Sequence, residues 1–169
     1  MSLSIKINKD FGNKQITIIS EFKASKDKIW NAFTNPEITD KWWAPKPYQA
    51  ITKQANFKDG GQWLYYMLSP EGEKHWCLAE FYNIKTMESY ELTDAFCDEN
   101  GNINTNLPRT NWKNSFNEEN GIIKVTNVLT YAKEEDMKQI LEMGFEEGYS
   151  MGLNQLNDLL NEKKIKSNI

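Results

Sequence analysis

The chain has 169 residues, of which 39% are hydrophobic and 26% charged, so a disordered or fibrous protein is excluded and a single domain over residues 1–169 is expected. The 24 acidic and 20 basic residues give a formal net charge of -4, which argues against binding to nucleic acid or to an anionic membrane. The one basic run, residues 163–166, is interpreted as the solvated end of a helix.

The cysteine pattern indicates the compartment. Cys77 and Cys97 are the two cysteines, and neither belongs to a Cys-x-x-Cys motif. No N-terminal segment has the charged-then-apolar pattern of a signal peptide, and no apolar run is long enough to span a membrane. We therefore expect a cytoplasmic protein with reduced thiols.

The first elements in chain order are strands. Residues 16–22 predict a strand in which Ile16, Ile18 and Phe22 share one face. Upstream, residues 3–7 alternate apolar and polar side chains and predict an additional short strand. A turn-rich segment separates the two.

Two short helices are predicted next. Residues 24–33 change to a helical period, and Ser25 is a suitable cap for that helix. Asn35 followed by Pro36 is typical of a cap with a first-turn proline, so a second short helix begins there. It ends by Pro45, because the residue before a proline avoids helical angles.

A series of strands follows, separated by glycine-rich or Asn-Gly turn signals. Residues 103–109 are polar and are expected to form a loop. The strands cover residues 48–57, 62–68, 75–84, 89–96, 110–116 and 122–131. In the last strand one face is formed by Ile123, Val125, Leu129 and Tyr131.

The chain ends in a long helical pattern over residues 133–163. Gly144, Gly148 and Gly152 recur in it at every fourth position, although each interior glycine costs about 1 kcal/mol relative to alanine. Their row indicates either close approach of the helix to a sheet or room for a molecule held between them; simple close packing is the alternative. Together the elements predict an α+β fold in which a curved antiparallel sheet wraps around the long C-terminal helix, with two short helices after the first strand.

Several of these segments carry a family pattern. From about Ile16 to Leu160 the chain resembles the activator of heat-shock protein 90 ATPase homologue family, C-terminal-domain type, of the START-like helix-grip (SRPBCC) superfamily. The matching residues are Ala24, Ile29, Trp30, Ala32, Thr34, Pro36, Glu37, Trp42 and Pro45 in the opening, Gly60-Gly61, Glu71-Gly72, and Gly148-Tyr149 in the closing helix.

The adjacent Trp42 and Trp43 fall in the last turn of the second predicted helix. In the family pattern this segment lies over the mouth of a cavity. We expect Trp42 to pack inward and Trp43 to cover the rim or to contact a partner. The alternative is that both rings fix the short helices to the sheet.

The resemblance implies a ligand-binding cavity between the sheet and the long helix. Aromatic residues are 12% of the chain and occur on several strands, where they form either cavity walls or a filled core. The candidate ligand-binding residues are Trp30, Trp42, Trp63, Tyr65, Phe81, Tyr90, Trp112, Phe145, Gly148 and Tyr149.

Residues with catalytic or metal-binding chemistry are few. His75 is the one histidine, and with Cys77 it supplies two of the four ligands of a structural zinc site, so no metal and no cofactor are expected. Nucleophilic catalysis would depend on this same histidine. Glu80 and Asp94 lie in apolar strand segments where burial would raise their pKa values, which leaves acid–base chemistry open.

Three functions are therefore considered. The leading hypothesis is non-catalytic binding of a small hydrophobic molecule by a monomer or homodimer. The family resemblance implies a protein-interaction module with a chaperone as partner in the stress response. The wider superfamily implies a cyclase- or hydrolase-like enzyme, which would require a buried carboxylate or His75 facing the cavity.

Overall fold

One antiparallel sheet forms the frame of the molecule in the computed structural model, which describes residues 3–167. Its strands are β1 (Ser4–Asp10), β2 (Gln15–Phe22), β3 (Gln49–Ala55), β4 (Gln62–Leu68), β5 (Lys74–Lys85), β6 (Ser89–Phe96), β7 (Thr110–Glu119) and β8 (Ile122–Thr130). The helices are α1 (Lys26–Thr34), α2 (Pro36–Thr39), α3 (Glu134–Glu142) and α4 (Phe145–Ser167). The side chains of the basic run at residues 163–166 lie outside the described residues.

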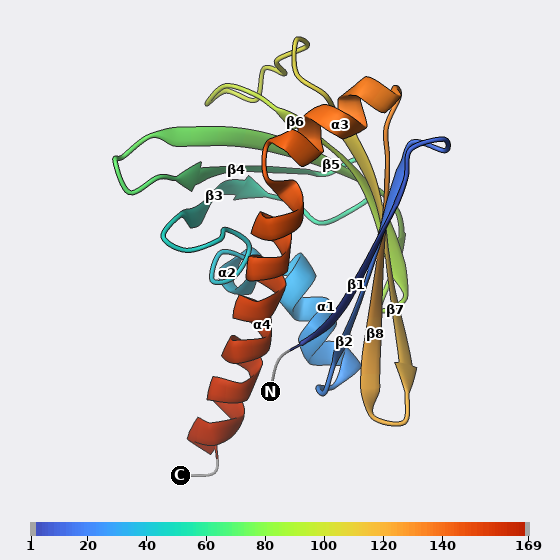
Figure 1. Ribbon diagram of the computed structural model, residues 1–169. Helices are drawn as coiled ribbons and strands as arrows, with labels where there is room; N and C mark the ends of the chain where they lie inside the picture. The colour runs from blue at the N-terminus through green and yellow to red at the C-terminus, as the bar shows by residue number, and fades with distance from the viewer. Residues whose placement is uncertain (1–2, 168–169) are drawn as a thin grey trace.

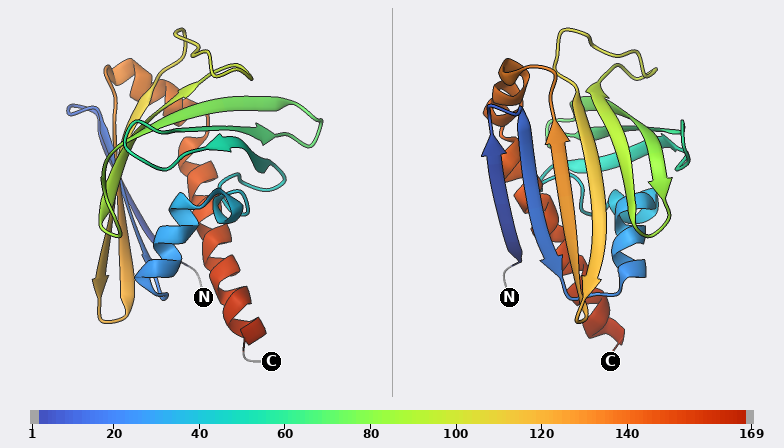
Figure 2. Two further views of the ribbon diagram at one scale, coloured as in Figure 1. Left: turned by 180° about the vertical axis from the view of Figure 1, so that it is seen from behind. Right: turned by 90° about the vertical axis from the view of Figure 1, so that its right-hand side faces the viewer.

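The sheet order is β1-β2-β8-β7-β6-β5-β4-β3, and every pairing is antiparallel. The sheet curves, and α4 runs across its concave side with α1 and α2 beside it (Figures 1 and 2). This arrangement confirms the predicted fold class. Within residues 3–162, no helix is both long enough and apolar enough to cross a bilayer.

The predicted strand faces are confirmed by their burial. Ile16 and Ile18 of β2 are 0% exposed, and so are Ile123 and Leu129 of β8. The pairing of Ile16 with Leu129 places both strands in one register with their apolar faces on the same side. The alternation read from the sequence therefore identifies the side of the sheet that faces the helices.

The two short helices begin at their predicted caps. The Lys28 N–H donates to Ser25 Oγ at 3.3 Å, and the Glu37 N–H donates to Asn35 Oδ1 at 3.2 Å. The second helix ends before Pro45 as predicted, but α2 already stops at Thr39, so the predicted placement of Trp42 and Trp43 in its last turn is wrong. The Thr39 hydroxyl donates to backbone oxygens of the preceding turns at 2.9 and 3.0 Å, and the next residue is held to β3 by side-chain bonds.

Trp42 and Trp43 consequently lie in a turn after α2 and not in its last helical turn. Their backbone N–H groups both donate to the Thr39 carbonyl oxygen, at 3.1 and 2.9 Å. Trp42 is 0% exposed, which confirms that this ring packs inward. Its indole N–H donates to the Ala32 carbonyl oxygen at 2.9 Å, so the buried polar group is satisfied.

The single long C-terminal helix predicted from the sequence is two helices. Gly144 separates α3 from α4 and has a φ of 86°, a left-handed conformation that ends α3 and that glycine adopts without a steric penalty. The helical period of the side chains continues across this break, which is why periodicity alone did not reveal it. Of the three glycines in the row, Gly148 and Gly152 lie inside α4.

Close approach of α4 is confirmed at Gly152, but its neighbour is the segment after α2 and not the sheet. A Cβ at Gly152 would lie 3.1 Å from the Trp42 carbonyl oxygen. Three residues further along, the Gln155 side-chain amide donates to the carbonyl oxygens of Trp42 and Ala44, at 3.0 and 2.8 Å, and accepts from the Lys46 N–H at 2.9 Å. Residues 42–46 are thereby fixed against the helix.

Candidate ligand-binding cavity

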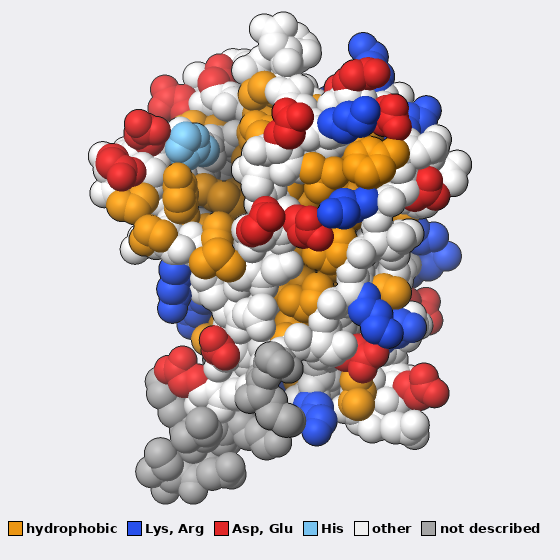
Figure 3. All heavy atoms as spheres, viewed as in Figure 1, with side chains coloured by type: hydrophobic (Ala, Val, Ile, Leu, Met, Phe, Trp, Pro, Cys, Tyr) orange, Lys and Arg blue, Asp and Glu red, His pale blue; other side chains and the backbone are white. Residues whose placement is uncertain are grey.

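A cavity of about 570 Å³ lies where β4, β5 and β6 meet the first turns of α4 and the loop after β6. Lys74, His75 and Met143 are exposed at its rim, and Met143 is 52% exposed. Hydrophobic side chains gather around the histidine on this face of the molecule (Figure 3). The cavity therefore opens to solvent at the end of the β4–β5 hairpin.

Aromatic rings form the inner wall of this cavity. The Trp112 ring on β7 lies 5.3 Å from Tyr149 and 5.8 Å from Phe145, both on α4. Trp43 contacts Tyr149 at 5.8 Å between ring centroids. These rings meet mostly edge to face, which is a preferred geometry of aromatic pairs.

The wall also carries a few polar groups. The Trp43 indole N–H donates to the Tyr65 hydroxyl at 3.0 Å, and the Trp112 indole N–H donates to Asp94 Oδ2 at 2.9 Å. Cys77 is the direct cross-strand partner of Tyr65. A hydroxyl, a thiol and a carboxyl from three neighbouring strands are thus presented to an otherwise apolar cavity, which is the usual composition of a small-molecule site.

Burial determines the protonation of these groups. Burial raises the pKa of Asp94 to about 7, an effect partly offset by hydrogen bonds from the Trp112 indole and the Thr110 backbone and by the charge of Arg109. Burial, reinforced by the Asp94 charge, raises the pKa of Cys77 to about 12. Cys77 is therefore a neutral thiol at physiological pH and not an activated nucleophile.

Half of the residues predicted to bind a ligand line this cavity, namely Tyr65, Trp112, Phe145, Gly148 and Tyr149. Trp63 and Phe81 line a smaller hollow of about 60 Å³ beside α1 and α2. Trp30, Trp42 and Tyr90 lie in the packed core, where each is at most 7% exposed. The candidate set came from the family pattern, because side-chain alternation within each strand did not show which face is concave. Nor did it show the point along each strand where the core ends and the cavity begins.

The cavity residues left out of the predicted set include Trp43, Cys77 and Asp94, which form part of its inner wall. Trp43, which was expected to cover the rim or to contact a partner, is half-buried and lines the cavity. Asp94 had a sequence signal, since it is a carboxylate within an apolar strand segment. Cys77 had none, because its position depends on the register of β4 against β5.

The remaining chemistry-bearing residues are dispersed. His75 is exposed at the rim and lies 3.6 Å from the Glu73 carboxylate. Within the described part of the chain, no three His, Cys, Asp or Glu side chains are grouped as metal ligands. Glu80 is exposed on the opposite face of the sheet, whereas Asp94 faces the cavity.

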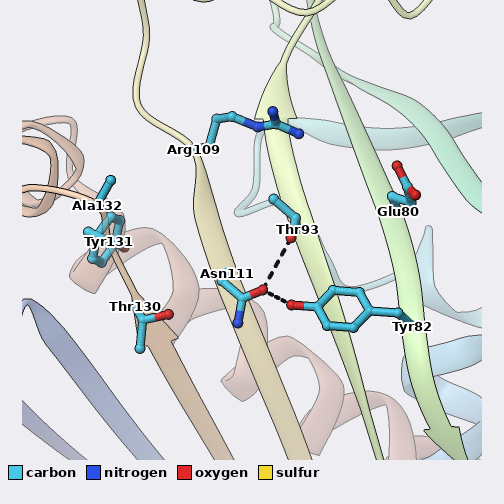
Figure 4. Close-up of a pocket in the computed structure, with 8 residues that line it drawn as sticks. All are labelled: Glu80, Tyr82, Thr93, Arg109, Asn111, Thr130, Tyr131 and Ala132. Atoms are coloured by element: carbon cyan, nitrogen blue, oxygen red, sulfur yellow. Dashed lines mark hydrogen bonds between the residues drawn. The ribbon is translucent and has the colours of Figure 1, made fainter. Parts of the chain in front are cut away.

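A second hollow lies on that opposite face, with a volume of about 600 Å³ (Figure 4). Asn111 Oδ1 accepts hydrogen bonds there from the Tyr82 hydroxyl and, at 3.1 Å, from the Thr93 hydroxyl. Arg109 and Glu80 are exposed at its border. Its central polar groups satisfy one another, and its lining is mostly polar with Tyr82 and Tyr131 as its aromatic residues, so it is less suited to an apolar molecule.

The curved sheet, the helix held across it and the aromatic cavity define a helix-grip protein of the START-like class. Residues 23–161 match the family model described as Activator of Hsp90 ATPase homolog 1-like protein, and the chain belongs to this family. The resemblance inferred from the sequence is thereby confirmed. No curated protein matches the chain.

Solved structures of bacterial proteins are similar over nearly the whole chain. Protein Ms6760 from Mycobacterium smegmatis is 33% identical, with a TM-score of 0.85, and the match covers 94% of this chain and 96% of that one. A protein from Arthrobacter aurescens is 29% identical, with a TM-score of 0.87 and coverages of 93% and 91%. A Staphylococcus epidermidis protein is 28% identical, with a TM-score of 0.81 and coverages of 93% and 94%.

Proposed function

We propose that the protein binds a small, largely apolar molecule in the cavity between β4–β6 and the start of α4, without altering it chemically. The observation that carries this proposal is an aromatic-walled cavity of about 570 Å³ with a small number of polar groups. Cavities of this size and composition suit drug-sized or cofactor-sized ligands. The family's helix-grip fold is consistent with such a role.

Native mass spectrometry of gently purified protein is the direct experiment. A mass above that of the chain, lost on denaturation, would reveal a retained molecule and allow it to be identified. As a complement, an apolar fluorescent dye should bind and be displaced by that molecule. Absence of any retained mass together with absence of dye binding would refute the proposal.

A Gly148→Leu variant tests whether the dye binds in this cavity. Gly148 lines the cavity, and a Cβ at this position would meet only the Pro45 ring at 3.7 Å, an ordinary contact. The added side chain should therefore occupy the cavity and reduce dye binding. Glu147→Leu is the matched control, because it adds the same side chain at an exposed position of the same helix and should leave binding unchanged.

An acid–base enzyme is the second candidate, and Asp94 is the observation that favours it. A carboxyl group with a pKa of about 7 that faces a cavity can accept or donate a proton at neutral pH. If the protein is an enzyme, Asp94→Asn should retain unreacted substrate, whereas the wild type should retain product or nothing. Identical retained molecules in both proteins would favour simple binding.

A further inference from the structure

We propose that the cavity selects an organic amine in its protonated form, and that the Asp94 carboxylate is the group that pairs with the ammonium. This inference rests on the proposed binding function and specifies its ligand class: an ammonium group on an apolar, preferably flat body. Two independent observations support it, the unfilled hydrogen-bonding capacity of Asp94 and the aromatic surroundings of the carboxylate.

Asp94 has acceptor capacity that the protein does not use. A carboxylate offers about four acceptor sites. The Trp112 indole N–H and the Thr110 backbone N–H occupy two of them. In the described part of the chain no Lys, Arg or His forms an ion pair with Asp94. Asp94 is half-buried in the cavity wall. A carboxylate withdrawn from water is normally paired, so an unpaired one that faces a cavity is arranged for a donor from outside.

The groups around Asp94 are neutral donors or rings, with one exception. Tyr65 on β4, Cys77 on β5 and Tyr131 after β8 are near enough to interact electrostatically with Asp94, and each is neutral at physiological pH. The exception is Arg109, which is exposed and borders the outer hollow of Figure 4. On the cavity side, Lys74 and His75 are exposed at the rim. Lys74 Nζ lies over the Tyr66 ring at 5.1 Å and His75 lies 3.6 Å from the Glu73 carboxylate, and among the described residues neither forms an ion pair with Asp94.

The aromatic wall suits a cation as well as an apolar body. Trp43, Trp112 and Tyr149 surround the same space as Asp94, and tryptophan is the ring that attracts cations most strongly through its face. An ammonium placed between these rings and the carboxylate would gain both interactions. A neutral ligand would gain neither in full, and a carboxylate ligand would be repelled.

Three probes with one indole body test the selection by calorimetry: tryptamine, tryptophol and indoleacetate. At about pH 8, tryptamine should bind the wild type about 10- to 100-fold tighter than tryptophol, the range expected of a charge-assisted hydrogen bond. Indoleacetate should bind most weakly. In Asp94→Asn the advantage of tryptamine over tryptophol should disappear. Glu80→Gln removes the same formal charge from the outer face and should preserve the advantage.

A pH series gives a readout that needs no variant. The tryptamine advantage in the wild type should shrink between about pH 8 and pH 5 as Asp94 gains its proton, because an aliphatic ammonium keeps its charge over this range. Histidine side chains titrate in the same interval. The series is therefore repeated on Asp94→Asn, where His75 is intact and the dependence on pH should be largely lost.

The outcomes separate the two proposals. Equal binding of tryptamine and tryptophol to the wild type would overturn the amine inference and leave the binding function standing. Retention of the tryptamine advantage in Asp94→Asn would overturn the assignment of Asp94. If none of the probes and no apolar dye binds, the proposed function fails and the amine inference fails with it.

Discussion

Asp94→Asn is predicted to stabilise the protein in a pH-dependent manner. In the folded protein the carboxyl keeps its proton up to about pH 7, whereas in the unfolded chain it ionises near its ordinary pKa of about 3.9. Between these values the unfolded state binds fewer protons, so wild-type stability falls by about 1.4 kcal/mol per pH unit as the pH rises. Asparagine has a similar shape, can accept from the Trp112 indole, and does not titrate.

The assay is urea denaturation of wild type and variant at about pH 5 and about pH 8. The two units between pH 5 and the folded pKa of about 7 predict that the stability advantage of Asp94→Asn grows by about 3 kcal/mol over this interval. Glu80→Gln, on the exposed face, should show no comparable change. An Asp94→Asn advantage that is the same at both pH values would refute the assignment of a raised pKa to this carboxyl.

Two further predictions concern the packing of α4, measured by thermal or urea denaturation. Gly148→Ala should stabilise the protein by about 1 kcal/mol through helix propensity. Gly152→Ala should destabilise it by about 1–3 kcal/mol, because the added Cβ would lie 3.1 Å from the Trp42 carbonyl oxygen. Equal effects of the two substitutions would contradict the close approach of α4 at Gly152. Gln155→Ala should cost about 1–3 kcal/mol by leaving partners in the Trp42 turn unpaired, while Asn154→Ala, whose bond lies within the helix, should have a smaller effect.

The fold was predictable because its signals are local. Alternation in β2 and β8 and the caps at Ser25 and Asn35 act within a few residues, so each could be recognised from the sequence. The break at Gly144 was not recognised, since the apolar period continues through it. The end of α2 at Thr39 was missed for a different reason: tertiary contacts with α1 and β3 decide it.

The cavity was predictable only in outline. Trp112 and Tyr149 were named as candidates together with Trp30 and Tyr90, and all four are aromatic residues of the same inner layer. Trp30 lies on α1 and packs against Tyr90 and Phe116, so this end of the sheet is filled. Trp112 and Tyr149 lie further from α1 and line the cavity instead. No sequence period encodes that distance, because it depends on how the short helix docks against β7.

The cavity lies at one end of the sheet, and the residues packed beside α1 lie outside it. The core beside α1, where Trp30 packs against Tyr90 and Phe116, does not line the cavity, whereas Trp112 and Tyr149 belong to both the core and the cavity wall. Substitution of exposed or half-buried lining residues, such as Met143, would change the cavity with little cost to the core, whereas substitution of Trp112 or Tyr149 would affect both. Relatives that share about a third of their residues can therefore keep one architecture while diverging in chemistry.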